Sequence, residues 1–598
     1  MYIDFIKNKK IFTINTIVLV IYILFYLLLF SQFPLKKSIP GNCDTWLVIS
    51  LSNTYINKIS GFFTGKMTGV SLYPVSDTMS YGEGSPGCAA IFILFRLLGF
   101  NNIFSYYFFI TLLFALTAFG VYLLSGLYLQ TRTAAFFAGF AFTCSNFMFA
   151  NIDDSIVIFY FLSALSLYFL KRFFSSGIKG YLLYGAIIGG LEIYFSLYVF
   201  IYQTIALVII SILNFNNVMK NKKLFFSGIF IYMFITFPFI FFYVNSLMKI
   251  NIVNPWSETY TTPGIISRCS LKLKDFFKVL PGNLIYSAKK PSKFFWPYIR
   301  RYAFSGYLIV ILALLSLKKH WKGEKELILI ALSGFLMSGG QEIRISGLTI
   351  HPLFFYLYNL FPCMAIMRVP LRAYFLVTLT ISILAAISLE EILKNIKNRN
   401  IYILFIIVVL LFHSVENIPF PFYACNVEKY HNIPAEYYNF FKNQKNRIIL
   451  DLPSNIGLDF RESGNNLFVY NREIIYMNWQ TQHKQNITGG VNGYYPVSRV
   501  IIQKYIDSLP ERNSFSSLSK LGVDYIVFHK TMLLPGEKNL LPQLNRSDYV
   551  EKVMETGDIS IFKMKILDIN PSESEKLPVY REKSEKFTDV LLKFLDLE

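Results

Sequence analysis

The sequence has few charged residues. They make up 16% of its 598 positions, whereas a soluble protein averages about 25%. Hydrophobic residues make up 54%, including 60 Phe and 40 Tyr, and the mean hydropathy is +0.44. This composition excludes an ordinary soluble protein. It predicts an integral membrane protein whose spans satisfy their own backbone hydrogen bonds.

The sequence also lacks the short motifs of several enzyme classes. It has no P-loop, no G-x-G-x-x-G, no G-x-S-x-G and no H-E-x-x-H. These absences count against ATP-driven transport, dinucleotide chemistry, α/β-hydrolase chemistry and zinc proteolysis. The six cysteines show neither a CxxC pair nor a Cys/His metal spacing.

The net charge of +20 is carried by short basic runs between apolar stretches. A nucleic-acid groove would need a continuous basic surface, so we expect no nucleic-acid partner. Short basic loops instead follow the rule that cytoplasmic loops of membrane proteins carry Lys and Arg. The bias toward Lys, Asn, Ile, Phe and Tyr is typical of AT-rich coding and indicates a bacterial source.

Apolar runs predict about eleven transmembrane helices. About 20 residues at about 1.5 Å each cross a hydrocarbon core of about 30 Å. The stretch 89–99 is too short to span and is expected to form an interfacial helix. The predicted spans are 11–31, 104–127, 134–150, 155–170, two within 180–215, 224–247, 303–317, 326–339, 373–391 and 401–414.

The basic joints predict the orientation of these spans. Placing the N-terminus in the cytoplasm puts every basic joint on the cytoplasmic side of the cell membrane. These joints lie at 132, 171–179, 220–223, 318–325 and 394–399. Residues 1–415 then form a multi-pass transmembrane domain, whose long outer loops are 32–103, 248–302 and 340–372.

From residue 416 the composition becomes mixed, and we predict an extracytoplasmic α/β domain over 416–598. His483 is expected at its surface. Strand-like runs lie at Arg447–Leu452, Asn471–Met477, Asp524–Phe528 and Ile559–Met564, and helix-like runs at Pro434–Lys442, Ser498–Ser508 and Lys586–Leu595.

Three outer segments carry acids close to the membrane. Asp44 follows the first span and is either a catalytic base or a helix cap. Asp153 and Asp154 precede a span, so they are either helix N-terminal acids or part of a metal or substrate site shared with Asp44. Glu192 is either an exposed turn acid or the wall of a cavity. Acids at this depth are costly to place and usually face a cavity or a partner.

Basic residues on the outer side are the second set of candidates. Arg368 and Arg372 lie four apart before a span, where the positive-inside rule disfavours them. At helical spacing they would form a fork for phosphate oxygens, although Pro370 between them can break that spacing. The alternative is that they reach toward lipid headgroups. His351 is a weaker candidate for substrate binding.

The layout resembles the GT-C glycosyltransferases, which are polytopic enzymes that use polyprenyl-phosphate-linked sugars. One span, an outer loop with an early Asp, a second acidic turn and an outer C-terminal domain carry this resemblance. Two segments resemble the bacterial YfhO-like branch. They are 356–374, which reads YLYNLFP followed by RVPLRAY, and 476–494, which contains Tyr-Met, a His and GVNGY.

The resemblance implies an inverting hexosyltransferase. It would move a sugar from a polyprenyl-phosphate carrier to a cell-envelope glycan or lipid on the outer face. Asp44 matches the family's catalytic base, and Asp153 or Asp154 matches an acid that binds acceptor or metal. Asp154 is therefore the candidate ligand for Mg²⁺ or Mn²⁺. The first loop lacks the Asp-Glu or Asp-x-Asp pair of several branches, and no Trp-Trp-Asp signature is present.

Two other functions remain open from the sequence. A flippase or transporter of lipid-linked glycans would need broken helices and inverted repeats. A polymerase or ligase of surface polysaccharide would share the carrier substrate and use the long outer loops. A non-catalytic scaffold is the remaining alternative.

Overall fold

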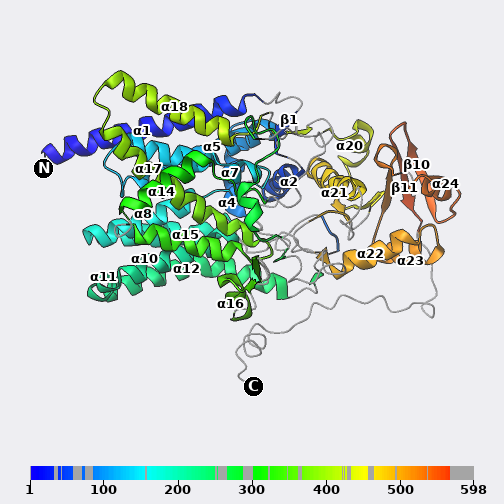
Figure 1. Cartoon of the computed structure of the whole chain (residues 1–598). Helices are drawn as coiled ribbons and strands as arrows, with labels where there is room; N and C mark the ends of the chain where they lie inside the picture. The colour runs from blue at the N-terminus through cyan, green and yellow to red at the C-terminus, as the bar shows by residue number, and fades with distance from the viewer. Residues whose placement is uncertain are drawn as a thin grey trace. The chain divides into compact units, whose positions relative to one another are not determined.

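The computed structural model describes 2–32, 38–41, 43–57, 71–74, 85–154, 158–248, 252–253, 266–267, 269–286, 301–320, 324–345, 348–360, 367–420, 422, 424–426, 432–454, 464–491, 495–534 and 537–565. The chain divides into two compact units (Figure 1). Unit 1 comprises Met1–Thr45, Leu94–Pro238 and Thr262–Cys425, and unit 2 comprises Trp46–Ile93, Phe239–Thr261 and Asn426–Glu598.

Unit 1 is a helical bundle, and a helix lies at each of the eleven predicted apolar runs. These helices are α1 (Tyr2–Phe30), α5 (Asn102–Ser125), α6 (Arg132–Thr143) with α7 (Asn146–Ala150), α8 (Phe161–Ser176), α9 (Lys179–Leu191), α10 (Leu197–Leu213), α12 (Lys222–Met248), α14 (Tyr307–His320), α15 (Lys325–Ser338), α17 (Tyr374–Lys394) and α18 (Arg399–Asn417). Short elements include η3 (Glu192–Tyr194), α11 (Phe215–Lys220), η4 (Leu273–Phe277), α16 (Leu353–Leu360) and η6 (Pro370–Ala373).

Six helical segments of the described chain are long and apolar enough to cross a membrane, which makes the chain a membrane protein. They are Phe12–Phe30, Asn102–Ser125, Arg132–Ala150, Lys222–Tyr243, Pro370–Lys394 and Arg399–Asn417. Shorter apolar helices lie at Pro86–Leu97, Leu197–Leu213 and Tyr307–Lys318. The predicted interfacial segment is therefore a helix, α4 (Pro86–Leu97), while its interfacial position stays a prediction.

The core of unit 1 forms where helices approach closely. Helix α17 packs against α6, α14 and α15, and residues on all its faces are buried, as expected for a helix that is apolar all round. Helices α5 and α6 meet at Gly139, where an added Cβ would lie 2.3 Å from the carbonyl oxygen of Ala118. Only glycine permits this approach.

Unit 2 contains a five-stranded mixed sheet of order β10-β11-β9-β6-β7. Strand β6 (Ile448–Leu452) runs parallel to β7 (Asn486–Ile487) and to β9 (Tyr525–His529). Strands β11 (Ile559–Met564) and β10 (Val550–Glu555) extend the sheet antiparallel. Its helices are α20 (Ala435–Phe441), α21 (Gly464–His483), α22 (Val497–Asp507), α23 (Arg512–Lys520) and α24 (Leu540–Asn545).

One hydrophobic cluster joins this sheet to its helices. Leu450, Ile526 and Phe562 of the central strands pack with Ile502 of α22 and Phe515 of α23. These strands are mainly apolar and almost fully buried, as expected of strands that are covered on both faces. The runs predicted at 447–452, 524–528 and 559–564 are therefore confirmed as strands.

Parts of the first and second predicted outer loops belong to unit 2. Helix α2 (Cys43–Asn57) crosses from unit 1 into unit 2 after Thr45. In unit 2 the Nδ2 atom of Asn478 donates to the carbonyl of Trp46 at 3.1 Å. The amide of Leu72 donates to the carbonyl of Gly489 at 2.9 Å. β2 (Ile252–Val253) pairs with β8 (Tyr495–Pro496). The predicted boundary at 416 left these contributions out.

Two predictions for the C-terminal part are wrong. The run Asn471–Met477 lies inside the helix α21 and is not a strand. His483 is buried in unit 2, where its ring contacts Tyr437 and Phe441, and is not at the surface. The predicted helix at 586–595 lies outside the described residues.

Candidate functional site

The loop before Asp44 lies directly against Asp153. Gly41 follows β1 (Ser38–Pro40) with a φ of +97°, a left-handed conformation that favours glycine. A Cβ at Gly41 would lie 2.8 Å from the Cβ of Asp153 and 2.2 Å from the Oγ1 of Thr45. The first-loop acid and the second-turn acids are therefore brought together within unit 1.

Tyr106 of α5 ties the same two segments to the bundle. Its hydroxyl, fully buried, lies 3.4 Å from the Oγ1 of Thr45 and 3.5 Å from the carbonyl of Ile152. The hydroxyl of Thr45 donates to the carbonyl of Pro40 at 3.0 Å. These contacts fix the start of α2, and hence the backbone next to Asp44.

Asp44 lies in the first turn of α2 and is partly buried. The partial positive charge of a helix N-terminus stabilises a carboxylate at this position. The predicted helix-terminal environment is thus present, and it is compatible with a reactive carboxylate. Its assignment as the catalytic base remains a prediction.

Asp153 and Asp154 lie between α7 and α8, and residues 155–157, which follow them, lie outside the described part of the chain. The two acids end a turn that follows α7, in which the amide of Asp154 donates to the carbonyl of Asn151 at 3.0 Å. Helix α8 begins at Phe161. The helix N-terminal interpretation of these acids therefore stays a prediction.

Arg372 forms an ion pair with Asp154 through its Nη2 and the Oδ2 of the acid. Arg372 belongs to η6, just before α17, and its guanidinium lies 4.2 Å from the ring centroid of Tyr198 at the start of α10. The side chains of Arg372 and Asp154 are 15% and 17% exposed. One of the predicted acidic residues and one of the predicted arginines therefore form a direct contact.

This arrangement combines acids and a cation in partial contact with solvent. A guanidinium carries five N–H donors in a planar fork that matches carboxylate and phosphate oxygens. Stacking on an aromatic face orients that fork. Ion pairs of this kind are worth less than about 1 kcal/mol when exposed, and breaking a buried one costs about 3–5 kcal/mol. Because the pair of Arg372 and Asp154 is partly exposed, the free energy that it contributes lies between these two values.

Arg368 and His351 are not placed on a common helix with Arg372. Arg368 precedes η6, which begins at Pro370, so the helical spacing of the two arginines is broken at the proline. Arg368 is partly buried. His351 is exposed, its ring stacks on Phe355 at 4.1 Å, and its Nδ1 lies 3.1 Å from the carbonyl of Gln341. Their roles in substrate binding stay predictions.

Glu192 is buried, so the exposed-turn interpretation is wrong. It begins η3 between α9 and α10 and is fully enclosed. The hydroxyl of Ser163 lies 3.2 Å from its Oε2 and also donates to the Oε1 of Gln203 at 2.7 Å. Glu192 therefore belongs to a polar network inside the bundle. A role for it in substrate binding stays a prediction.

The described residues do not provide a preformed metal site. Nowhere in the described part of the chain do three His, Cys, Asp or Glu side chains gather as metal ligands. Asp154, the predicted ligand, has Arg372 as its counter-charge. Mg²⁺ can be held by one or two carboxylates together with waters and substrate phosphates. We therefore derive no chemical step through a metal.

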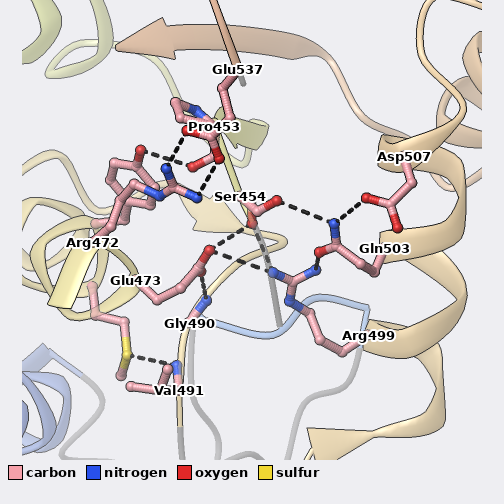
Figure 2. A network of polar contacts seen from close by, with 12 residues as sticks. Pro453, Ser454, Arg472, Glu473, Gly490, Val491, Arg499, Gln503, Asp507 and Glu537 are labelled. Atoms are coloured by element: carbon pink, nitrogen blue, oxygen red, sulfur yellow. Dashed lines mark hydrogen bonds and ion pairs between the residues drawn. The ribbon is translucent and has the colours of Figure 1, made fainter. Parts of the chain in front are cut away.

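A second polar network lies in unit 2, at the end of β6 (Figure 2). The Nη2 of Arg499 donates to Ser454 at 2.7 Å and lies 3.5 Å from the Oε1 of Glu473. The other carboxylate oxygen of Glu473 accepts from the amide of Gly490 at 2.7 Å. Arg499 and Glu473 are each 1% exposed. The network ties β6, α21, α22 and the segment after β7 together.

Beside it, Arg472 is fully buried and forms two hydrogen bonds with Glu537, at 2.9 and 3.1 Å (Figure 2). Its Nη1 also donates to the carbonyl of Met532 at 3.1 Å. Each buried charge of this region thus has a charged and a hydrogen-bonded partner, as stable burial requires. We assign a structural role to both networks.

Sequence reasoning missed Gly41, Thr45, Tyr106 and Tyr198. Gly41 carried a signal, because a glycine three residues before a candidate acid allows close backbone approach. Tyr106 and Tyr198 lie in apolar helices rich in aromatic residues, where no local pattern distinguishes a tyrosine that supports the site from one that fills the core.

No protein-family model and no curated protein sequence matches the chain. Among solved structures, it is similar to the arabinofuranosyltransferase AftD from Mycobacteria, at 13% identity and a TM-score of 0.48, over 92% of this chain and 41% of that one. The chain thus spans about two fifths of the length of AftD.

It is also similar to the archaeal oligosaccharyltransferase AglB from Archaeoglobus fulgidus, solved with an inhibitory peptide and a dolichol-phosphate. That match has 12% identity and a TM-score of 0.39, and it covers 86% of this chain and 69% of that one. The A. fulgidus oligosaccharyltransferase solved with Zn and sulfate has 12% identity and a TM-score of 0.38. That match covers 89% of this chain and 71% of that one. At these scores the similarity carries no argument, and the proposals below rest on the chain's own residues.

Proposed function

We propose that the chain is an inverting glycosyltransferase that moves a sugar from a polyprenyl-phosphate carrier to a cell-envelope glycan or lipid at the outer face of the membrane. The observation that carries this proposal is the meeting of the Asp44 segment, Asp153, Asp154 and Arg372 in an apolar helical bundle. We further propose that about eleven helices cross the membrane, with the N-terminus in the cytoplasm and the C-terminal sheet outside.

In this proposal Asp44 accepts the proton of the acceptor hydroxyl. The hydroxyl oxygen attacks the anomeric carbon as the bond from that carbon to the carrier phosphate breaks, which inverts the configuration. A positioned general base contributes about 10²–10⁴ in rate. No covalent intermediate is needed, because one direct displacement gives the inverted product, and the carrier phosphate leaves as a stable anion.

Arg372 has the complementary role. The leaving phosphate gains negative charge in the transition state, and a preorganised guanidinium stabilises that charge. Asp154 and Tyr198 hold Arg372 in place through the ion pair and the ring contact. Membrane lipid surrounds the bundle, and the carrier phosphate would approach from it. We propose no nucleic-acid partner.

The test is mass spectrometry of cell-envelope glycans from cells with and without the protein. We expect one glycan to lose a hexose in the deletion strain and to regain it with the wild-type gene but not with Asp44→Asn. Glu436→Gln is the matched control, because Glu436 is an exposed acid in the first turn of α20. Restoration by Asp44→Asn would refute the catalytic role.

The flippase and polymerase alternatives predict different glycans. A flippase would leave the carrier-linked glycan complete but trapped on the inner leaflet, and a polymerase or ligase would change chain length or attachment without removing a sugar type. Either result in the deletion strain would replace the proposed hexose transfer.

A further inference from the structure

Unit 1 contains a cavity of about 460 Å³, open on one side, between α8, α9, α10, α11 and α12. Its walls are apolar apart from the hydroxyls of Ser166, Thr204, Ser211 and Tyr232. Thr204 and Tyr232 bond each other at 2.6 Å, and the two serines donate to backbone carbonyls at 3.0 and 2.8 Å. These polar groups are satisfied by the protein, so the walls fit a hydrocarbon chain.

The cavity is elongated along α10. Its lining residues on that helix run from Thr204 to Ile212, a rise of about 12 Å at about 1.5 Å per residue. Val208 and Ile212 are 50% and 65% exposed, so the cavity opens sideways onto an apolar surface. Such a surface in a membrane protein faces lipid.

Three lysines stand at one end of this cavity. Val218 of α11 and Phe225 of α12 line the cavity, and between them lie Lys220, Lys222 and Lys223, all exposed. Within the described part of the chain, these lysines form no ion pair with an acid. Lys171 at the neighbouring α8 is different, because it pairs with Glu326 at 3.0 Å.

We propose that this cavity binds an acyl chain of an anionic phospholipid, whose headgroup phosphate lies against Lys220, Lys222 and Lys223. The apolar walls accept the chain, and the three positive charges complement the headgroup. Basic residues beside a membrane surface each add to the attraction of anionic lipid. The site is separate from the cluster of Asp44 and Arg372 and does not depend on the proposed transferase activity.

The test is native mass spectrometry of the delipidated full-length protein, titrated with dioleoyl phosphatidylglycerol and with dioleoyl phosphatidylcholine. We expect the anionic lipid to bind at least about tenfold more tightly to the wild-type protein. The triple variant K220Q/K222Q/K223Q should lose this preference. The control K318Q/K397Q/R399Q removes three exposed charges at other joints and should keep it.

A second variant tests the cavity itself. Val208→Trp fills the space beside α10 and should weaken the binding of both lipids by a similar factor. Ile407→Trp places the same ring at a similarly exposed position of α18 and should weaken neither lipid. The charge variant changes only exposed side chains, so its result stands even if Val208→Trp does not fold.

Several results would overturn the proposal. Equal affinity of the wild-type protein for the two lipids would remove the role of the lysines. An equal loss in the two triple variants would make the attraction non-specific. A polyprenyl phosphate that binds more tightly than phosphatidylglycerol, and is weakened by Val208→Trp, would assign the cavity to the sugar carrier.

Discussion

Two polar clusters of this protein, one in each unit, contain the same kinds of groups and differ in their access to solvent. In unit 1, Arg372 and Asp154 are 15% and 17% exposed. In unit 2, Arg499 and Glu473 are each 1% exposed and lie among further hydrogen-bond partners. An arginine–carboxylate pair is therefore not by itself a sign of catalysis.

The difference lies in what each cluster can still do. A buried network whose arginines and carboxylates pair with one another holds elements together and leaves no place for a substrate. A partly exposed pair beside further carboxylates can exchange partners with a phosphate at moderate cost. Catalytic variants should therefore lower activity without unfolding unit 1, and variants of the buried network should unfold unit 2.

The largest expected effect on stability is that of Arg499→Leu. Removing one partner of a buried ion pair leaves the other charged and buried, which costs about 3–5 kcal/mol. The midpoint for the unfolding of unit 2 in a denaturant titration should therefore move to a lower denaturant concentration. Arg512→Leu changes an exposed arginine of α23 and should stay within about 0.5 kcal/mol. An equal effect of the two would mean that the network carries no special stability.

Arg372→Gln should lower the rate of sugar transfer. Loss of a preorganised donor to developing charge costs about 10²–10³ in rate, while the folded protein should remain. Arg399→Gln, an exposed residue at the start of α18, is the matched control. Initial rates of sugar transfer in proteoliposomes measure the effect. Unchanged rates in Arg372→Gln would assign the ion pair to stability alone.

The pH dependence of unit 2 tests the burial of His483. Burial removes the imidazole of His483 from water, and this desolvation lowers its pKa from an ordinary 6.5 to about 4. The unfolded chain therefore binds the proton first as the pH falls below about 6.5, and stability is lost between that pH and about 4. The loss approaches about 3 kcal/mol.

His483→Gln should flatten this part of the curve of unfolding free energy against pH. His351→Gln removes an exposed imidazole and should leave the curve as it is in the wild-type protein. A wild-type curve that is level between pH 6.5 and 4 would show that His483 is not buried as described.

The smallest effect is expected for Thr45→Val. It removes the hydrogen bond to the carbonyl of Pro40, which costs about 0.5–1.5 kcal/mol, and it loosens the start of the helix that carries Asp44. Transfer should fall a few-fold, and Thr45→Ser should restore it. Failure of the serine variant to restore the rate would point to packing of the methyl group instead.

The helices of unit 1 could be predicted from the sequence because each contains an apolar run, although only six helical segments of the described chain are long and apolar enough to cross a membrane. Their ends were less predictable. Residues 155–170 were expected as a span, yet α8 begins at Phe161, because the turn at 151–154 packs against Gly41 and Tyr106. These partners are distant in sequence, and no local pattern reports them.

The sequence predicted one site shared by Asp44 and the acids at 153–154, with arginines to bind phosphate, but it did not specify which acid and which arginine pair. Asp154 and Arg372 were both singled out, and their ion pair follows from the placement of η6 beside the turn after α7. The burial of Glu192 and His483 was not foreseen, because a polar residue in a turn or at a helix end is usually exposed. Asn471–Met477 ends in the short apolar run Ile474–Met477. A run of this length cannot be assigned to strand or helix by periodicity alone, and it folds as part of α21.

The most direct test of the account is the rate of sugar transfer by the purified protein in proteoliposomes that contain a polyprenyl-phosphate sugar. Asp44→Asn is compared with the wild type and with Glu436→Gln, at equal amounts of folded protein. We predict a loss of about 10²–10⁴ in Asp44→Asn alone, with an unchanged melting temperature. A wild-type rate in Asp44→Asn would contradict the assignment of the outer-face chemistry to this carboxylate.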